Sequence, residues 1–368
     1  LILFFFFKQK TAYEIVSRDW SSDVCSSDLG GVYPIPTLVF SSFQLMFAII
    51  TPALISGAIA DRTKFTAWAV FVAAWVSIVY FPVAHWVFDF GDKVGEKLIG
   101  VGYLAGKGVL DFAGGTAVHI NAGAAGLALA LVLGKRHGWR RDPMRPHSLP
   151  LVLLGSGLLW FGWFGFNAGS ALGANGIAGL ALINTQVATG AALIGWLLVE
   201  KIRDGHATSL GAASGAVAGL VAITPACAFV APWAAVVLGL IAGIVCAMAV
   251  GLKYKFGFDD SLDVVGVHLV GGIWGCLSIG LFATKGVNSL GGNGLFNGGG
   301  LDLLKTQAFG AFFVLAYSFL VTLIIGFVIN KTIGFRVSQE AEVNGIDLVE
   351  HRETAYEMFS SSRGGISA

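Results

Sequence analysis

Nine apolar stretches of about membrane-spanning length constrain this chain more than any other feature of its sequence. A helix that crosses a bilayer needs roughly 20 apolar residues, and each stretch approaches or exceeds that length. Over the whole chain 55% of residues are hydrophobic and 12% are charged, whereas soluble domains carry about a quarter charged residues. Because backbone that faces lipid must satisfy its own hydrogen bonds, we predict an all-α integral membrane protein. The stretches are 37–59, 65–88, 111–133, 149–171, 176–200, 209–229, 232–252, 263–283 and 304–332.

Lysine and arginine are distributed unevenly between the connections that join these stretches. One alternating set of connections, together with the C-terminal tail, carries 15 of these residues, and the other set carries five. The positive-inside rule therefore predicts a multi-pass protein of the cell membrane with a cytoplasmic C-terminus. The net charge of +1 gives no indication of a nucleic-acid partner, and membrane lipid is the expected surrounding.

The beginning of the chain differs from the rest. Residues 1–29 open with seven apolar residues and then lose all periodicity, and no basic region precedes the apolar run as it does in a secretory signal. This string resembles a translated sequencing adapter, so we interpret it as an artefactual leader outside the fold, and we expect the natural sequence to begin further upstream. We expect a transmembrane domain over 30–333 and a cytoplasmic tail over 334–368.

Two phrases recur five spans apart. LDFAGGTAVHIN contains His119 and LDVVGVHLVGG contains His268, and the tripeptide Thr-Pro-Ala occurs at 51–53 and again at 224–226. A five-span unit crosses the membrane an odd number of times, so its two copies lie in opposite orientations, as in many transporters. This pattern predicts inverted repeats, with about two helices missing from the first copy and the last span outside the repeat.

His119 and His268 are ionisable groups inside apolar spans, where such groups are costly and usually face a pathway. Two imidazoles brought together by the repeat can share a proton, because neutral imidazole both donates and accepts a hydrogen bond. Asp111 lies eight residues before His119 and shares its helix face, whereas Asp263 precedes His268 by five residues and is expected to cap its helix. Two alternatives fit the same histidines: a structural bond to a neighbouring carbonyl, and bis-histidine ligation of haem.

Four long motifs resemble the ammonium transporter family, whose branches are called Amt, Mep and Rh. In chain order they read DFAGGTAVHINAG, GWFGFNAGSA, SGAVAGLVAITPA and DVVGVHLVGGIWG, and the resemblance covers about 30–356. It implies a fold of two inverted five-helix repeats plus a final helix, with about nine of eleven transmembrane helices present. It further implies a homotrimer with one pore per protomer, ammonium or ammonia as the substrate, no enzymatic activity, and neither cofactor nor metal.

The resemblance also assigns a recruitment site for ammonium. Ser170 matches the serine of an external vestibule, and Phe47 and Phe88 match its aromatic walls, with Phe88 standing where the family has a tryptophan. Aromatic faces stabilise a cation that is losing its hydration shell. Asp111 matches an aspartate beside this site, and we expect it either to brace the vestibule backbone or to tune the electrostatic potential of the vestibule, without binding ammonium directly.

Beyond the vestibule, the resemblance implies a gate and a pore. Phe47 and Phe166 match two stacked gate phenylalanines, and Trp163 matches a pore-lining tryptophan beside the twin histidines His119 and His268. A bare ammonium ion in such a lumen would incur a large desolvation penalty. The expected solution is deprotonation, passage of neutral ammonia and return of the proton along the imidazoles.

The polar tail resembles the cytoplasmic C-terminus of the family, for which a PII-type regulatory protein is a possible partner. A second functional hypothesis is an ammonium sensor that signals through this tail. Because only EMFSSSRGGISA follows Tyr356, we expect no fused signalling domain and favour transport.

Overall fold

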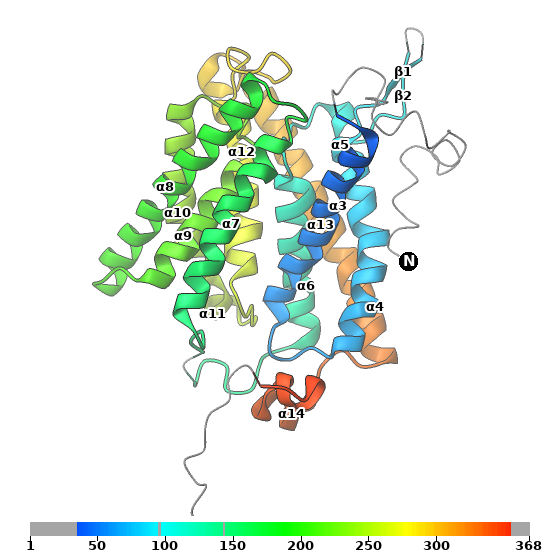
Figure 1. The fold of residues 1–368 in the computed structure, drawn as a ribbon, viewed down its shortest axis with the longest axis vertical. Helices are drawn as coiled ribbons and strands as arrows, with labels where there is room; N and C mark the ends of the chain where they lie inside the picture. The colour runs from blue at the N-terminus through cyan, green and yellow to red at the C-terminus, as the bar shows by residue number, and fades with distance from the viewer. Residues whose placement is uncertain (1–34, 95–96, 143, 355–368) are drawn as a thin grey trace, which may run out of the picture.

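The predicted bundle of membrane helices is confirmed. The computed structural model describes residues 35–94, 97–142 and 144–354, so the expected leader 1–29 lies outside the described residues. Within the described part, eight helices are long and apolar enough to cross a membrane, and a ninth apolar helix is shorter. Each of the nine coincides with one predicted stretch to within a few residues, and the helices stand roughly side by side (Figure 1). The chain is therefore a multi-pass membrane protein.

The helices follow one another in this order: α3 (Thr37–Ile59); a second span formed by α4 (Phe65–Trp75), η2 (Val76–Tyr80) and α5 (Phe81–Phe88); η4 (Gly115–Ile120) continuing into α6 (Asn121–Leu133); α7 (Leu149–Gly169); α8 (Gly176–Asp204); α9 (Ser209–Ile223); α10 (Pro232–Ala249) followed by α11 (Leu252–Phe256); η5 (Val265–Leu269) continuing into α12 (Val270–Phe282); and α13 (Asp302–Thr332).

Side chains that accept backbone hydrogen bonds define where three of these helices begin. Ser148, Asn175 and Thr208 each precede a helix and accept from the amide three residues later. Such caps satisfy amides that have no partner within the first turn. The starts of α7, α8 and α9 therefore follow directly from the local sequence.

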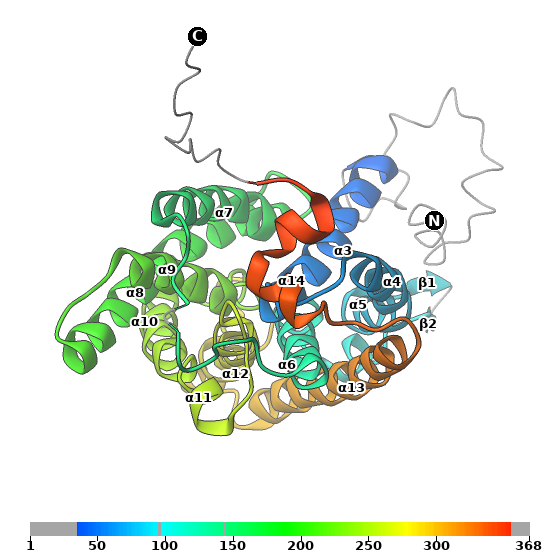
Figure 2. The ribbon, with the colours of Figure 1, turned by 90° about the horizontal axis from the view of Figure 1, so that it is seen from below.

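The lysine- and arginine-rich connections gather at one end of the bundle, which we call the tail-side face. It comprises the basic connections 60–64 and 134–148, the connection 257–264, whose charged residues are three aspartates, and the segment 333–354, which contains α14 (Gln339–Asn344) and η7 (Asp347–His351) and lies across the bundle in Figure 2. Backbone bonds attach this segment to the first connection: the Lys64 amide donates to the Phe335 carbonyl, and the Val337 amide donates to the Arg62 carbonyl.

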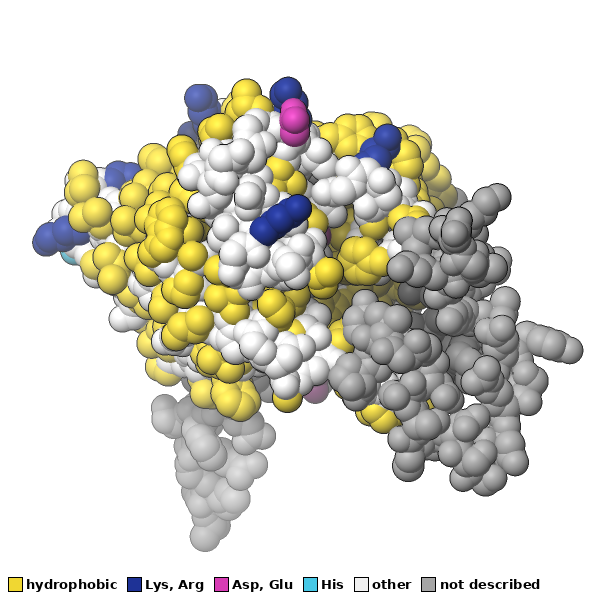
Figure 3. Space-filling model, turned by 90° about the horizontal axis from the view of Figure 1, so that it is seen from above, with side chains coloured by type: hydrophobic (Ala, Val, Ile, Leu, Met, Phe, Trp, Pro, Cys, Tyr) yellow, Lys and Arg dark blue, Asp and Glu magenta, His cyan; other side chains and the backbone are white. Residues whose placement is uncertain are grey.

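The opposite face carries longer connections, including elements that the sequence analysis did not predict. A short antiparallel hairpin joins β1 (Asp92–Val94) to β2 (Lys97–Ile99), and two 3-10 turns follow at η3 (Ala105–Lys107) and η6 (Leu295–Asn297). Seen from this side, the described surface is mostly apolar and uncharged, with scattered basic side chains (Figure 3).

Apolar side chains on α7 face outward from the bundle. Leu158 and Phe161 are 63% and 77% exposed, and Leu154 is also exposed. Exposed apolar surface of this extent on a helix requires lipid or another protein chain to cover it. The fold therefore fits a membrane environment and leaves a helix face available for assembly.

Candidate functional site

The two repeated histidines meet in the interior of the bundle. His119 lies in η4 and His268 in η5, both are buried, and their Nδ1 atoms are 3.3 Å apart. The rings are nearly parallel, with centroids 5.4 Å apart and planes inclined by 24°. The structure therefore brings together the histidines of the two repeated sequence motifs.

Each histidine lies in a short stretch of π-helix, which the sequence analysis did not predict. In η4 the His119 amide donates to the Gly114 carbonyl, five residues earlier. Such wider turns are rare and occur mostly inside α-helices at functional sites. Both stretches continue into ordinary α-helix, in α6 and α12, so each histidine stands at an irregular start of its span.

Asp111 organises the beginning of η4. Its buried carboxylate accepts hydrogen bonds from the amides of Gly114, Gly115 and Thr116 at 2.7–2.8 Å and from the Thr116 hydroxyl. These donors occupy both carboxylate oxygens, and a negative charge at a helix N-terminus is favoured by the helix dipole. The contacts agree with the expectation that Asp111 braces backbone.

Asp260, which the sequence analysis missed, has the equivalent position at η5. Its carboxylate accepts from the amides of Val264 and Val265 at 3.0 and 2.7 Å. The expectation that Asp263 caps this helix is wrong: Asp263 adopts a left-handed backbone conformation (φ 64°) and forms an ion pair with Lys253 at 2.7 Å. The shared spacing would have revealed Asp260, because it precedes its histidine by eight residues, as Asp111 does.

Glycines allow the two histidine helices to approach closely, and their positions follow the same repeat. Gly123 and Gly272 each lie four residues after a histidine. A methyl group on Gly123 would come within 2.5 Å of the Leu269 amide nitrogen, and one on Gly272 would meet Ile120 and the Cβ atom of His119 at 3.1 Å. Each glycine thus contacts the residue that follows the opposite histidine, which is the relationship expected of two inverted copies.

Aromatic rings form a continuous row that leads to the histidines. Phe47 and Phe166 lie with ring centroids 4.5 Å apart, and the Phe166 ring is 6.3 Å from that of His119. The Trp163 ring stacks on His119 at 5.5 Å with planes inclined by 15°, and its indole N–H donates to the Thr224 hydroxyl. Thr224 belongs to the second Thr-Pro-Ala tripeptide and was not predicted to contact the site.

The proposed vestibule residues differ in how close they lie to this row. Ser170 ends α7 and donates its hydroxyl to the Phe166 carbonyl at 2.9 Å, which leaves its oxygen free to accept. Phe88 ends α5 and packs, half-buried, against a separate apolar cluster that includes Val87 and Leu104. No described aromatic side chain makes a ring contact with Phe88, so the structure does not bring it to Phe47.

The distance between the imidazoles bears on the haem alternative. Axial ligands lie on opposite sides of an iron atom, so two nitrogens each about 2 Å from a metal would be about 4 Å apart. The observed 3.3 Å between the Nδ1 atoms of His119 and His268 is too short for that arrangement and fits a long hydrogen bond. This geometry favours a direct hydrogen bond between the two imidazoles.

Comparison with known proteins agrees with the features of the site. The family model described as the Ammonium Transporter Family matches residues 9–356, a range that begins within the expected leader. An ammonium transporter of Mycobacterium bovis is 55% identical over 357 residues, which cover 95% of this chain and 74% of that protein. An ammonium transporter of Bacillus subtilis is 47% identical over 324 residues, covering 88% of this chain and 77% of that one.

Solved structures show the same fold. The crystal structure of Saccharomyces cerevisiae Mep2 superposes with a TM-score of 0.76 at 36% identity, covering 83% of this chain and 68% of that one. A structure titled as a sensor Amt protein superposes with a TM-score of 0.75 at 31% identity, covering 84% of this chain and 76% of that one. With nine apolar helices in its described part, paired buried histidines and these matches over most of its length, the chain belongs to the ammonium transporter family.

Proposed function

We propose that this protein carries ammonium across the membrane by recruiting NH4+, removing its proton, passing NH3 along an apolar lumen and returning the proton through His119 and His268. The observation that carries the proposal is the 3.3 Å distance between the two buried Nδ1 atoms. Two histidines from opposite repeats that share a hydrogen bond form a neutral path along which a proton can be handed on.

The shared hydrogen bond fixes complementary tautomers. One Nδ1 must carry the proton and the other must accept it, so the Nε2 atom of the first ring is an acceptor and that of the second is a donor. The pair therefore offers an acceptor at one end and a donor at the other. His119 Nε2 is buried and has no hydrogen-bond partner among the described residues, which leaves it available to a passing substrate.

The aromatic row supplies selectivity in this proposal. The rings of Phe47 and Phe166 stand between solvent and the histidines and exclude hydrated ions. A cation held over an aromatic face gains about 1 kcal/mol or more when partly desolvated, and the Ser170 hydroxyl can accept one ammonium N–H. Phe88 contributes as a more distant wall of the vestibule. Potassium has no proton to lose, so it is refused at the deprotonation step.

Assembly and orientation complete the proposal. The exposed apolar face of α7 supports a homotrimer surrounded by membrane lipid. The lysine and arginine content of the tail-side face supports a cytoplasmic location for it in the cell membrane, with 30–333 as the transmembrane domain and 334–368 as the tail. A PII-type regulatory protein that binds this face is a proposed partner.

An ammonium sensor is the second candidate, because a structure titled as a sensor Amt protein shares the fold. Purified protein in liposomes separates the two functions. Transport predicts a transient inward current upon an ammonium jump, with no current upon a matched potassium jump. A sensor without transport would give no ammonium current, while ammonium would still change the binding of a tail-side partner protein.

A further inference from the structure

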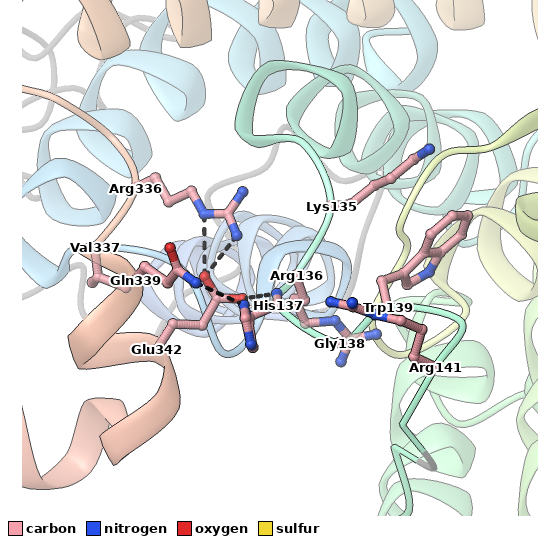
Figure 4. Close-up of a pocket in the computed structure, with 10 residues that line it drawn as sticks. All are labelled: Lys135, Arg136, His137, Gly138, Trp139, Arg141, Arg336, Val337, Gln339 and Glu342. Atoms are coloured by element: carbon pink, nitrogen blue, oxygen red, sulfur yellow. Dashed lines mark hydrogen bonds and ion pairs between the residues drawn. The ribbon is translucent and has the colours of Figure 1, made fainter.

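The tail-side face contains a cavity of about 570 Å³ that no step of ammonium transport uses (Figure 4). It lies between the 134–148 connection and the segment around α14, and these two parts of the chain are held together across it. The Gln339 side-chain nitrogen and His137 Nδ1 are 3.0 Å apart, and the Glu342 carboxylate accepts from the His137 amide. The residues that line the cavity are Lys135, Arg136, His137, Gly138, Trp139, Arg141, Arg336, Val337, Gln339 and Glu342.

Positive charge dominates this lining. Lys135, Arg136, Arg141 and Arg336 line the cavity, against Glu342 as the single carboxylate. An excess of fixed cations around a concave site attracts and retains anions. Some of these cations are already paired with carboxylates of the protein. An arginine without such a partner keeps its hydrogen-bond donors for a ligand.

The arginines differ in how far the protein already satisfies them. Arg136 forms ion pairs with the buried carboxylate of Asp259 at 2.9 Å and with Asp61 at 3.2 Å. Arg336 donates to Glu342 at 2.6 Å. The Arg141 guanidinium makes no hydrogen bond or ion pair with any described residue, although it points into the same cavity.

The loop that presents these cations is fixed in place. The Trp139 ring stacks on Tyr254 with centroids 6.1 Å apart, and the Lys135 ammonium lies 4.8 Å from the Trp139 centroid. A site whose binding side chains are already held in position loses less conformational entropy when a ligand binds.

We propose that this cavity binds a phosphate-bearing anion, carried either by a free molecule or by a lipid headgroup, through direct contact with Arg141 and Arg336, while Arg136 adds positive charge beside them. Guanidinium groups match phosphate oxygens with paired, charge-assisted hydrogen bonds. A bound phosphate competes with Glu342 for Arg336 and repels its carboxylate. Because the Glu342 carboxylate also accepts from the His137 amide, its displacement loosens the attachment of the α14 segment to the 134–148 connection and couples an anionic ligand to the position of the tail.

The proposal is tested with pyrophosphate titrated calorimetrically into the purified protein in phosphatidylcholine nanodiscs. We expect saturable binding that Arg141→Gln weakens about tenfold, the loss expected for one charge-assisted contact. Arg145→Gln is the matched control: it removes the same charge from the same connection but does not line the cavity. Glu342→Gln should lower the dissociation constant, because it removes the competing carboxylate.

A second arm distinguishes the source of the anion. Nanodiscs that contain phosphatidylinositol 4-phosphate are compared with pure phosphatidylcholine by native mass spectrometry, with the same three variants. Retention of that lipid without pyrophosphate binding assigns the site to headgroups, and the reverse assigns it to free molecules. Absence of both, or equal weakening by Arg141→Gln and Arg145→Gln, overturns the proposal.

Discussion

His119 and His268 share a hydrogen-bond distance of 3.3 Å between their Nδ1 atoms although they are 149 residues apart in the chain. That contact exists because two inverted segments cross where each has a glycine four residues after its histidine. The geometry of the imidazole pair therefore depends on helix packing as much as on the histidines themselves. The predictions below separate these contributions.

Gly123→Ala should disrupt transport without touching a pore residue. The added methyl group would lie 2.5 Å from the Leu269 amide nitrogen, so the helix that carries His268 must move away. Ammonium-dependent current should fall severalfold or more. Gly190→Ala is the control, since a Cβ atom there meets nothing within 4 Å; equal loss in both variants would contradict the packing argument.

Asp111→Asn should destabilise the protein by about 3 kcal/mol, because several donors at a helix start lose a charged acceptor. The amide has one acceptor oxygen in place of two and cannot satisfy the amides of Gly114, Gly115 and Thr116 together. Thermal unfolding in detergent measures the change. The same substitution at Asp302, whose side chain is 95% exposed, should leave the melting temperature unaltered.

Ser170→Ala should raise the ammonium concentration that gives half-maximal current about fivefold, while the maximal current stays near wild type. The hydroxyl that accepts one ammonium N–H would be lost, a contribution of about 1 kcal/mol. Ser156→Ala tests the specificity of the effect, because Ser156 also lies on α7 and bonds to a carbonyl, that of Ala213. An unchanged half-maximal concentration for Ser170→Ala would remove it from the recruitment site.

The tail-side ion pairs should make stability depend on pH. Burial raises the pKa of Asp259, but hydrogen bonds from Arg136 outweigh burial and hold that pKa below its usual value of 3.8. A carboxylate with a depressed pKa stabilises the folded state above its unfolded pKa, and this stabilisation is lost as pH falls through the folded value. The melting temperature should therefore drop as pH decreases below about 4.

Two substitutions test that assignment. Asp259→Asn should cost about 3 kcal/mol at neutral pH, because it leaves buried arginine charge without its partner, and should flatten the acid-side pH dependence. Asp61→Asn removes a 68% exposed partner of the same arginine and should cost less than about 1 kcal/mol. If the two variants lose similar amounts of unfolding free energy, burial of the carboxylate does not determine how much an ion pair with Arg136 stabilises the fold.

The sequence predicted the number and place of the apolar helices because membrane spans are specified by length and composition, which are local properties. The convergence of His119 and His268 also followed from the repeat. Asp260 was missed because the motif was aligned on the phrase Leu-Asp, which selected Asp263; the spacing of eight residues to the histidine identifies the correct aspartate.

Other features could not be read from periodicity. The π-helical turns at His119 and His268 depend on carboxylate caps and close helix contacts that form only in the folded protein. The separation of Phe88 from Phe47 depends on how α5 packs against its neighbours, which a residue-by-residue motif match does not contain.

The most direct test of the proton relay is the ammonium-dependent current of His268→Ala in liposomes, measured beside wild type and the control His206→Ala, whose histidine is exposed between α8 and α9. Thermal unfolding of each variant confirms that it is folded. The relay predicts loss of the ammonium current in His268→Ala alone, with wild-type current in His206→Ala. Full, potassium-excluding ammonium current in folded His268→Ala would contradict the account.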